Sequence, residues 1–186
     1  MFEIGKYETA AATFADYDPR ASKIAQLLIE AIEERDPRLA VEHIGSTAVP
    51  GCRGKGIIDL AVAIAEGGLE SAKAALDVLG FQKQSGREPF PETRPMRVAT
   101  VSAGGSFRVH AHVIERNGPE HRELIAFRDA LRRDPELRSA YEKTKEQILA
   151  NGITDSLDYS KAKGAFITAI LAGRVPDSLR PAILLE

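Results

Sequence analysis

An apolar, mostly β-branched run at residues 57–64 is interrupted by a single carboxylate, Asp59. Apolar side chains on both faces predict a strand that is covered on both sides, near the centre of a sheet. Side chains alternate along a strand, so Asp59 shares a face with Ala61. Because a buried carboxylate without a partner is costly, we expect Asp59 to face a cleft near a strand end or to pair with Arg53, Lys55 or a metal ion. A salt bridge with a purely structural role is the alternative.

The segment before this strand has the composition of a phosphate-binding turn. Residues 39–44 have the pattern of a short strand, which ends in a Gly-Ser-Thr turn at residues 45–47. Residues 46–56 are expected to form a loop, because a proline and three glycines interrupt any regular element. Hydroxyls and exposed backbone N–H groups at such a turn are suited to bind phosphate. The turn and Asp59 therefore define one candidate site.

The rest of the chain lacks a steady strand–helix repeat. Helical spacing of apolar residues predicts helices at residues 19–36 and 69–79, and three more after Pro119 that are separated by Asp134-Pro135 and Asn151-Gly152. Further strands are expected at residues 81–84, 97–102 and 107–115, the last two as a hairpin. The proline-rich residues 85–95 are expected to form an exposed loop. This order predicts an α+β fold, with helices packed on a mixed or antiparallel sheet.

Composition sets limits on the fold and on partners. A chain of 186 residues, 44% of them apolar, can build one core, and we expect a single domain over residues 1–186 with a tail at 174–186. The net charge of -2 provides no general attraction to nucleic acids or anionic membranes, so neither is an expected partner. The sequence shows no signal-peptide pattern and no apolar run of about 18 residues, which predicts a cytoplasmic protein.

Four strings of the sequence resemble the GrpB family. They are EHIGSTAVPG, GKGIIDLAV, FRDALRRDPELRSAYEKTK and YSKAKGAFI, and the resemblance runs from about Tyr17 to Leu171. This family is similar to the nucleotidyltransferase superfamily and is also found beside dephospho-CoA kinase domains. The resemblance implies a small mixed sheet flanked by helices, with a helical C-terminal part. It also implies that Gly45 and Ser46 form the phosphate-binding turn and that Asp59 is a metal-binding carboxylate.

The chain departs from that superfamily at one position that matters for catalysis. Active members generally carry a second acid two residues after the first, and their carboxylates hold Mg²⁺, which binds the triphosphate oxygens. The corresponding residue here is Ala61, whose methyl group cannot bind a metal. The resemblance therefore leaves two possibilities open, an active nucleotidyltransferase and a protein that keeps only the ligand-binding pocket.

The second strand of the predicted hairpin offers imidazole ligands. By alternation, Arg108, His110 and His112 share one face of this strand. Together with Asp59, the two histidines are candidate catalytic and metal-binding residues, and imidazole suits Zn²⁺, Mn²⁺ or Fe²⁺ better than Mg²⁺. His43 would complete a set of four ligands if its strand lies beside that of Asp59. The alternatives are a site for phosphate or carboxylate only, and unrelated polar residues on sheet faces.

Several residues are candidates for binding an anionic ligand. Those expected to bind substrate or phosphate are His43, Gly45, Ser46, Thr47, Lys55, Arg108, Tyr159 and Lys163. Tyr159 and Lys163 match the Tyr-x-x-x-Lys pattern of the family, in which the tyrosine can stack or form a hydrogen bond. The helical cations that are expected to be solvated instead are Arg128, Arg132, Lys145 and Lys161. The proline-rich loop, which could close over a substrate, carries or adjoins Arg87, Arg94 and Arg97.

Three functions are compatible with these residues. The first is a nucleotidyltransferase-like protein that binds a nucleotide or another phosphorylated small molecule and transfers a nucleotidyl or phosphoryl group with a divalent metal such as Mg, Mn or Zn. The second is a non-catalytic nucleotide- or anion-binding module. The third is a metal-dependent hydrolase that uses His110, His112 and Asp59. If these residues form a site, Asp59 and His112 must lie in one cleft with Ser46. If they point to different sides of the sheet, the predicted site is wrong.

Overall fold

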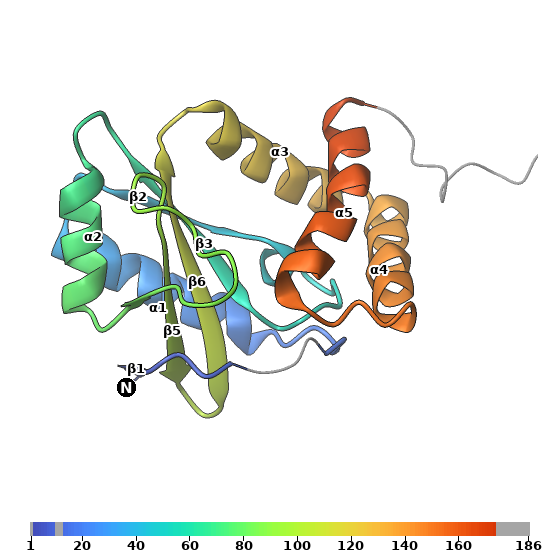
Figure 1. Cartoon of the computed structure of the whole chain (residues 1–186), viewed down its shortest axis with the longest axis horizontal. Coiled ribbons are helices and arrows are strands. Elements are labelled where there is room, and N and C mark those ends of the chain that lie inside the picture. The colour runs from blue at the N-terminus through green and yellow to red at the C-terminus, as the bar shows by residue number, and fades with distance from the viewer. Residues whose placement is uncertain (1, 10–12, 174–186) are drawn as a thin grey trace, which may run out of the picture.

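The computed structural model describes residues 2–9 and 13–173, which form a six-stranded mixed sheet and five α-helices (Figure 1). The strands are β1 (Glu3–Gly5), β2 (Ala40–Ile44), β3 (Ile58–Ile64), β4 (Gln82–Lys83), β5 (Met96–Ser102) and β6 (Ser106–Glu115). The helices are α1 (Arg20–Arg35), α2 (Leu69–Val78), α3 (Pro119–Arg133), α4 (Pro135–Ala150) and α5 (Ser156–Leu171), and a 3-10 turn, η1 (Ser46–Ala48), follows β2. The predicted α+β fold with a helical C-terminal part is confirmed. The predicted tail at 174–186 lies outside the described residues.

β3 lies inside the sheet, as its two apolar faces predict. The strand order is β1-β5-β6-β3-β2, and β4 pairs with β5. β3 runs parallel to β6 and antiparallel to β2, and the remaining pairs are antiparallel. β1 was not expected from the sequence, because its three residues are too few for a period-two pattern to show.

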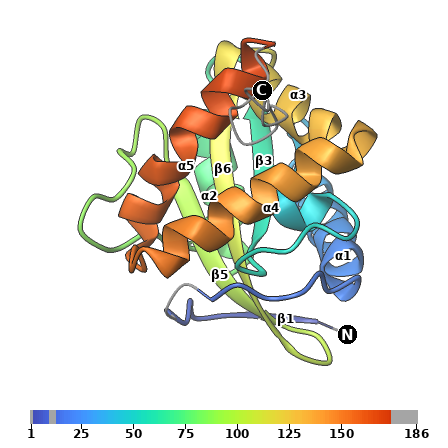
Figure 2. The ribbon, with the colours of Figure 1, turned by 90° about the vertical axis from the view of Figure 1, so that its right-hand side faces the viewer.

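The helices cover the two faces of the sheet unequally. α1 and α2 pack on one face, where the buried α1 residues Ile24, Leu28 and Ile32 join the core formed with Leu60 and Val62 of β3. α3, α4 and α5 lie on the opposite side of the sheet, which we call the second face (Figure 2). Of these helices, α3 contacts β2 and β6 directly. The second face therefore keeps part of its surface open. No helix in the described part of the chain is long and apolar enough to cross a membrane.

The alternation of side chains in β3 and β6 places the polar residues on the second face. Leu60 and Val62 of β3 are fully buried in the core beneath α1, together with Val109 and Ala111 of β6. The residues that alternate with these along β3 and β6 point to the side of α3. They include Asp59, Ala61, Arg108, His110 and His112. The strand faces predicted from the sequence are thus confirmed.

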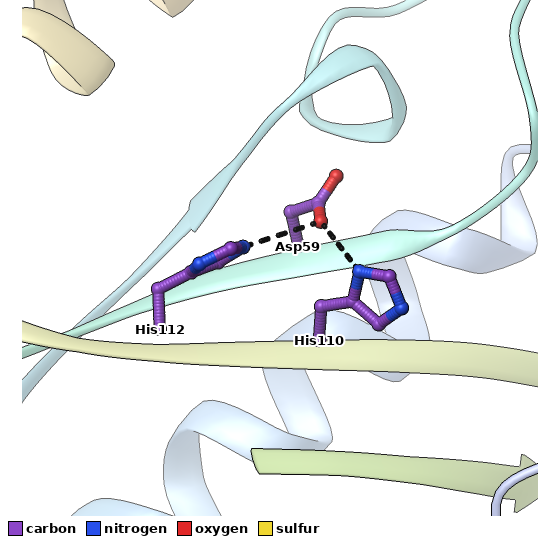
Figure 3. Close-up of side chains that lie close together, drawn as sticks. All are labelled: Asp59, His110 and His112. Atoms are coloured by element: carbon purple, nitrogen blue, oxygen red, sulfur yellow. Dashed lines mark ion pairs between the residues drawn. The ribbon is translucent and has the colours of Figure 1, made fainter. Parts of the chain in front are cut away.

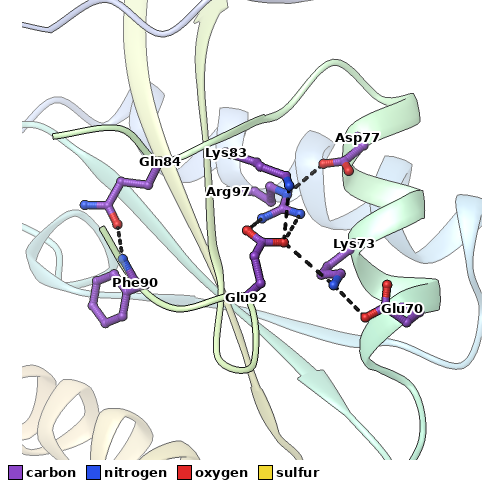
Figure 4. Close-up of polar contacts among 8 residues, drawn as sticks. All are labelled: Glu70, Lys73, Asp77, Lys83, Gln84, Phe90, Glu92 and Arg97. Atoms are coloured by element: carbon purple, nitrogen blue, oxygen red, sulfur yellow. Dashed lines mark hydrogen bonds and ion pairs between the residues drawn. The ribbon is translucent and has the colours of Figure 1, made fainter. Parts of the chain in front are cut away.

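The proline-rich loop at residues 85–95 is fastened to the sheet by a buried arginine (Figure 4). Arg97 of β5 has 1% of its side chain exposed, and its guanidinium donates to Asp77 (2.7 Å) and to Glu92 (3.0 Å). Two lysine ammonium groups lie 3.7 Å from the same Glu92 carboxylate. Arg97 points into the α2 side of the sheet, so it holds the loop and does not point toward the second face of the sheet.

Replacing Arg97 by alanine is expected to destabilise the fold by about 3 kcal/mol, since buried charge pairs are costly to break, although the half-exposed carboxylates limit the loss. Lys83→Ala is a matched control, because this lysine lies near the same Glu92 carboxylate but is 68% exposed. Its effect should stay within about 0.5 kcal/mol. The measurement is urea-induced unfolding followed by circular dichroism. Equal effects of the two substitutions would contradict a buried anchoring role for Arg97.

Candidate functional site

Asp59, His110 and His112 converge on the second face of the sheet (Figure 3). Nδ1 of His110 and Nε2 of His112 each lie 3.6 Å from Oδ1 of Asp59. One ligand atom from each residue lies within 4.8 Å of the other two. The three side chains are partly exposed, at 27% for Asp59, 16% for His110 and 18% for His112, so solvent and a small ligand can reach them.

The parallel register of β3 and β6 produces this convergence. Asp59 pairs with His110 and Ala61 pairs with His112. Paired residues of neighbouring strands project to the same side of the sheet. The imidazole of His112 therefore stands next to the methyl group of Ala61, the position at which the resemblance described above implied a second acid.

The donor set fits a transition metal. Two ligands at 2.0–2.2 Å from a tetrahedral ion lie roughly 3.4 Å apart, close to the spacing of the imidazole nitrogens from Oδ1 of Asp59. Two nitrogen donors and one carboxylate suit Zn²⁺, Mn²⁺ or Fe²⁺, whereas Mg²⁺ prefers oxygen ligands alone. Three protein ligands also leave a coordination position open for water or substrate. Asp59, His110 and His112 could therefore hold a catalytic type of metal ion.

The charge of Asp59 is set by two opposing effects. Burial raises the pKa of its carboxyl, but His110 and His112 outweigh burial and hold this pKa well below its usual range. Asp59 is therefore ionised at neutral pH. An ionised carboxylate between two imidazoles attracts a cation, and imidazole nitrogens are metal ligands in their neutral form.

Tyr7 contacts the outer nitrogen of His110, and sequence reasoning missed it. The Tyr7 hydroxyl lies 2.8 Å from Nε2 of His110, on the side of the ring away from Asp59. The backbone around Tyr7 is held because its N–H donates to Gln82 (3.2 Å) and the next N–H donates to Thr100 (2.8 Å). A partner on the outer nitrogen fixes the orientation of an imidazole ligand. No sequence pattern indicates this contact, since it arises from the pairing of β1 with β5.

The substitution Tyr7→Phe is expected to reduce metal affinity roughly 10- to 100-fold, because the outer hydrogen bond of an imidazole ligand orients it and raises its basicity. Zinc affinity can be measured by competition with a chromogenic chelator. Tyr17→Phe is the matched control, since the Tyr17 hydroxyl bonds Ser22 (3.0 Å) and contacts none of the three candidate ligands. Unchanged zinc affinity in Tyr7→Phe would show that the contact with His110 does not support a metal site.

Gly45 approaches Asp59 so closely that no other residue fits. Its φ is +72° and its ψ is -172°, a backbone conformation that is essentially restricted to glycine. A Cβ atom at this position would lie 2.5 Å from Oδ2 of Asp59 and 3.1 Å from its Cβ. The turn after β2 is thus shaped around the Asp59 side chain. This gives the predicted Gly-Ser turn a packing role beside the carboxylate.

Lys55, Tyr159 and Lys163 cluster near Asp59. Nζ of Lys55 lies 4.5 Å from the centre of the Tyr159 ring, and Nζ of Lys163 lies 5.0 Å from it. Burial and the positive charge of Lys163 lower the pKa of Lys55 to about 8, whereas Asp59 raises it. Burial also lowers the pKa of Lys163, again against the effect of Asp59. With Arg108, which adds to the positive charge at Lys55, these residues make a cationic region beside the candidate metal ligands.

A cavity of about 180 Å³ adjoins this cationic region. It lies between the N-terminal segment, the residues after β4 and the second face of the sheet. Its lining residues are Tyr7, Thr9, Lys55, Ile57, Gln84, Ser85, Met96, Val98, Arg108 and His110. The cavity therefore shares an imidazole and two cations with the candidate site.

His43 does not join the group of ligands. It pairs with Leu60, so it lies on the opposite face of the sheet from Asp59. The set of four ligands that would have combined His43 with Asp59 and the two histidines of β6 is therefore not formed. Its Nε2 lies 3.0 Å from Oγ1 of Thr47, which in turn donates to the carbonyl of Ile57 (2.9 Å). Burial lowers the pKa of His43 to about 4, so it is neutral at physiological pH. The hydroxyl of Thr47 is thus engaged within the protein.

Ser46 also lies apart from the cavity beside His110. It lines a separate hollow of about 20 Å³ together with Cys52 and Gly54. Asp59 and His112 are brought together as expected, but the Ser46 hydroxyl is not brought into the same cavity. The Gly-Ser turn reaches Asp59 through the backbone at Gly45.

Cations of α3 and α4 hold the loop at residues 46–56. The side chains of Arg132, Arg138 and Lys145 donate to the carbonyls of Ala48, Pro50 and Arg53. Arg128 likewise donates to the carbonyl of His43 (3.1 Å). A loop without regular structure leaves backbone carbonyls without partners, and the side chains of α3 and α4 supply hydrogen bonds to them.

Two of the helical cations that were expected to be solvated differ in exposure. The prediction that Lys145 is solvated is wrong, because only 2% of this residue is exposed. Lys161 is exposed, as expected.

The fold resembles that of known nucleotidyl-transferring proteins. The GLD-2/RNP-8 complex aligns with a TM-score of 0.54 at 16% identity, over 89% of this chain and 64% of that chain. Cid1 in complex with its short product ApU aligns with a TM-score of 0.51 at 15% identity, over 74% of this chain and 42% of that chain. Identities this low show the fold alone, so the class defined here is a protein of nucleotidyltransferase-like fold.

Sequence relatives then identify the family. The family model described as "GrpB protein" matches residues 11–173. A UPF0157 protein of Streptomyces coelicolor is 34% identical, over 90% of this chain and 86% of that protein. The crystal structure of conserved protein GrpB from Enterococcus faecalis aligns with a TM-score of 0.65 at 26% identity, over 87% of this chain and 96% of that chain. The chain belongs to the GrpB family.

Proposed function

We propose that this chain binds a divalent transition metal through Asp59, His110 and His112 and binds a phosphorylated small molecule or nucleotide beside it. The bound metal would support transfer of a phosphoryl or nucleotidyl group. The observation that carries this proposal is the convergence of one carboxylate and two imidazoles from neighbouring strands within 4.8 Å. A structure of terminal uridylyl transferase 4 from Trypanosoma brucei, which has a similar fold, contains bound dUTP, and this supports a nucleotide as one class of ligand.

The surroundings of Asp59 favour an anionic ligand. Lys55, Lys163 and Arg108 gather near Asp59 of the sheet, and Asp155 also acts on Lys55, so three cations face two carboxylates there. A pKa of about 8 leaves Lys55 mostly protonated at pH 7, and therefore able to pair with phosphate. The hydroxyl of Tyr159 is buried and has no hydrogen-bond partner among the described residues, so a ligand or a water can satisfy it.

The chain contributes positioning and charge to the reaction. When bound, the metal ion would act as a Lewis acid on a phosphoryl oxygen. The ionised Asp59 and the nitrogens of His110 and His112 that face it would hold that ion. Tyr7 orients His110, and Lys55 and Arg108 would neutralise the charge that develops on the phosphoryl oxygens in the transition state. Gly45 keeps the Asp59 carboxylate in place.

Hydrolysis is a second candidate, favoured by the number of ligands. Two histidines and one carboxylate are the protein ligands of several zinc hydrolases, in which water takes the fourth position. Water would then be the acceptor of the phosphoryl group. A binding module without catalysis is the remaining reading, in which Ala61 marks the loss of the carboxylate set.

The test begins with the full chain stripped of metal and reloaded with Zn²⁺ or Mn²⁺. Thermal unfolding is recorded with inorganic phosphate and with each nucleoside triphosphate. A ligand at 100 times its dissociation constant adds about 2.7 kcal/mol of stability, which is a readily measured shift. We expect stabilisation that depends on the metal and is weakened by Lys163→Gln. Absence of any metal-dependent shift with all these compounds would refute the proposal.

Turnover assays separate the three readings. Release of labelled phosphate into solution indicates hydrolysis, and label retained on an added acceptor indicates transfer. Stabilisation by a triphosphate without turnover under either condition indicates the binding module.

A further inference from the structure

The cavity beside His110 indicates what the ligand carries besides its phosphate. We infer that it accommodates a small, neutral, hydroxylated group, so that the ligand is a phosphate monoester between glycerol and a pentose in size and not a nucleotide. This inference rests on the proposed function, because it places the phosphate of the ligand at Lys55 and Arg108.

The position of the cavity connects it to the candidate metal ligands. Val98 of β5 pairs with His110, and Met96 pairs with His112, so both apolar side chains lie on the second face directly beside the imidazoles. Val98, Met96, Lys55, Arg108 and His110 all line the cavity. A molecule with its phosphate at the two cations would extend over the floor formed by β5.

The lining of the cavity selects for neutral polar groups. Its described lining residues include no aspartate or glutamate, so a cationic group would find no carboxylate among them. The walls supply the side chains of Tyr7, Thr9, Gln84 and Ser85, which can donate and accept hydrogen bonds. The floor is apolar and suits the C–H groups of a carbon chain or ring. This combination of an apolar floor and several hydrogen-bonding groups is complementary to a polyol or a small sugar.

The cavity is too small to enclose a whole nucleotide. Its volume is about 180 Å³. Pockets that enclose drug-sized ligands usually measure about 300–1,000 Å³. A nucleoside triphosphate would therefore leave its base or its triphosphate outside.

The walls of the cavity are held in place. The side-chain oxygen of Gln84 accepts a hydrogen bond from the backbone N–H of Phe90 (3.0 Å, Figure 4), and that of Gln82 accepts from the N–H of Tyr7 (3.2 Å). Glu92 ties the same loop to Arg97. The cavity is therefore preformed, and a preformed cavity can discriminate ligands by size.

The experiment compares probes on the metal-loaded full chain by calorimetric titration. The probes are inorganic phosphate, glycerol 3-phosphate, ribose 5-phosphate, AMP and glycerol. We expect at least one of the two small esters to bind at least tenfold tighter than both inorganic phosphate and AMP, and glycerol not to bind. AMP that binds tighter than both esters would overturn the inference and leave the proposed function standing. No binding of any of these phosphate compounds, together with no metal-dependent thermal shift with any nucleoside triphosphate, would overturn the proposed function itself.

Two variants localise the effect. Ser85→Phe adds bulk from an exposed position of the loop into the cavity and should weaken the esters at least tenfold while leaving inorganic phosphate unchanged. Lys55→Gln should weaken the esters and inorganic phosphate alike. Ester binding that Ser85→Phe does not change would show that the ester lies outside the cavity, and this too would overturn the inference.

Discussion

Replacing His112 by alanine is expected to lower zinc affinity by more than about 100-fold, because it removes one of three direct ligands. Loss of only the outer hydrogen-bond partner of such a ligand costs roughly 10- to 100-fold. Only Asp59 and His110 would remain at the site, and two ligands rarely hold zinc in a protein. Asp59→Asn should have an effect of similar size, since it removes the negative charge between the imidazoles. Zinc content after purification and competition with a chromogenic chelator measure both effects.

His121→Ala is the control for this experiment. His121 is buried and hydrogen-bonds a carboxylate, with Nε2 2.7 Å from Oε2 of Glu42, but it lies on α3 outside the convergent group. Loss of its hydrogen bond lowers stability without removing a candidate ligand. Zinc affinity should therefore stay near that of the unchanged chain. If His112→Ala and His121→Ala retain the same zinc affinity, the convergent group is not the metal site.

The faces of β3 and β6 could be predicted from the sequence, whereas the pairing of these strands could not. Alternation along a strand is local, so Asp59 and the two histidines could be assigned to polar faces without knowledge of the fold. The register that puts Asp59 next to His110 joins segments about fifty residues apart. The same limit explains His43, whose face depends on its pairing with Leu60. A shift of one residue in either register would have exchanged the faces.

Buried cations were the second feature that the sequence did not reveal. Arg97 and Lys145 look like surface residues in a linear pattern, because their partners come from distant segments. Arg97 is buried by carboxylates of α2 and of the proline-rich loop, and Lys145 by a carbonyl and a thiol of the loop before β3. Charged residues are rarely buried unless they are paired, so their burial can be recognised only when the partners are known.

Gly45→Ala is expected to disrupt both stability and metal binding. The φ of +72° and ψ of -172° lie in a region that costs of order 1–3 kcal/mol for a residue with a side chain. The added Cβ would also lie 3.1 Å from Cβ and 3.2 Å from Cγ of Asp59, so rotation of the carboxylate alone cannot make room. Either the turn or β3 must shift. We expect a destabilisation of at least about 2 kcal/mol in urea unfolding, together with loss of zinc affinity.

Gly152→Ala separates the effect of backbone strain from the effect of the clash with Asp59. Gly152 has a φ of +79°, and a Cβ added there would meet nothing within 4 Å. Its substitution carries backbone strain alone, about 1 kcal/mol, in the segment between α4 and α5 and far in sequence from Asp59. Zinc affinity should be unchanged in Gly152→Ala and reduced in Gly45→Ala. Because a displaced Asp59 would weaken the site even in a folded chain, affinity must be compared under conditions where both variants are folded. Wild-type affinity in folded Gly45→Ala would show that the turn does not position the carboxylate.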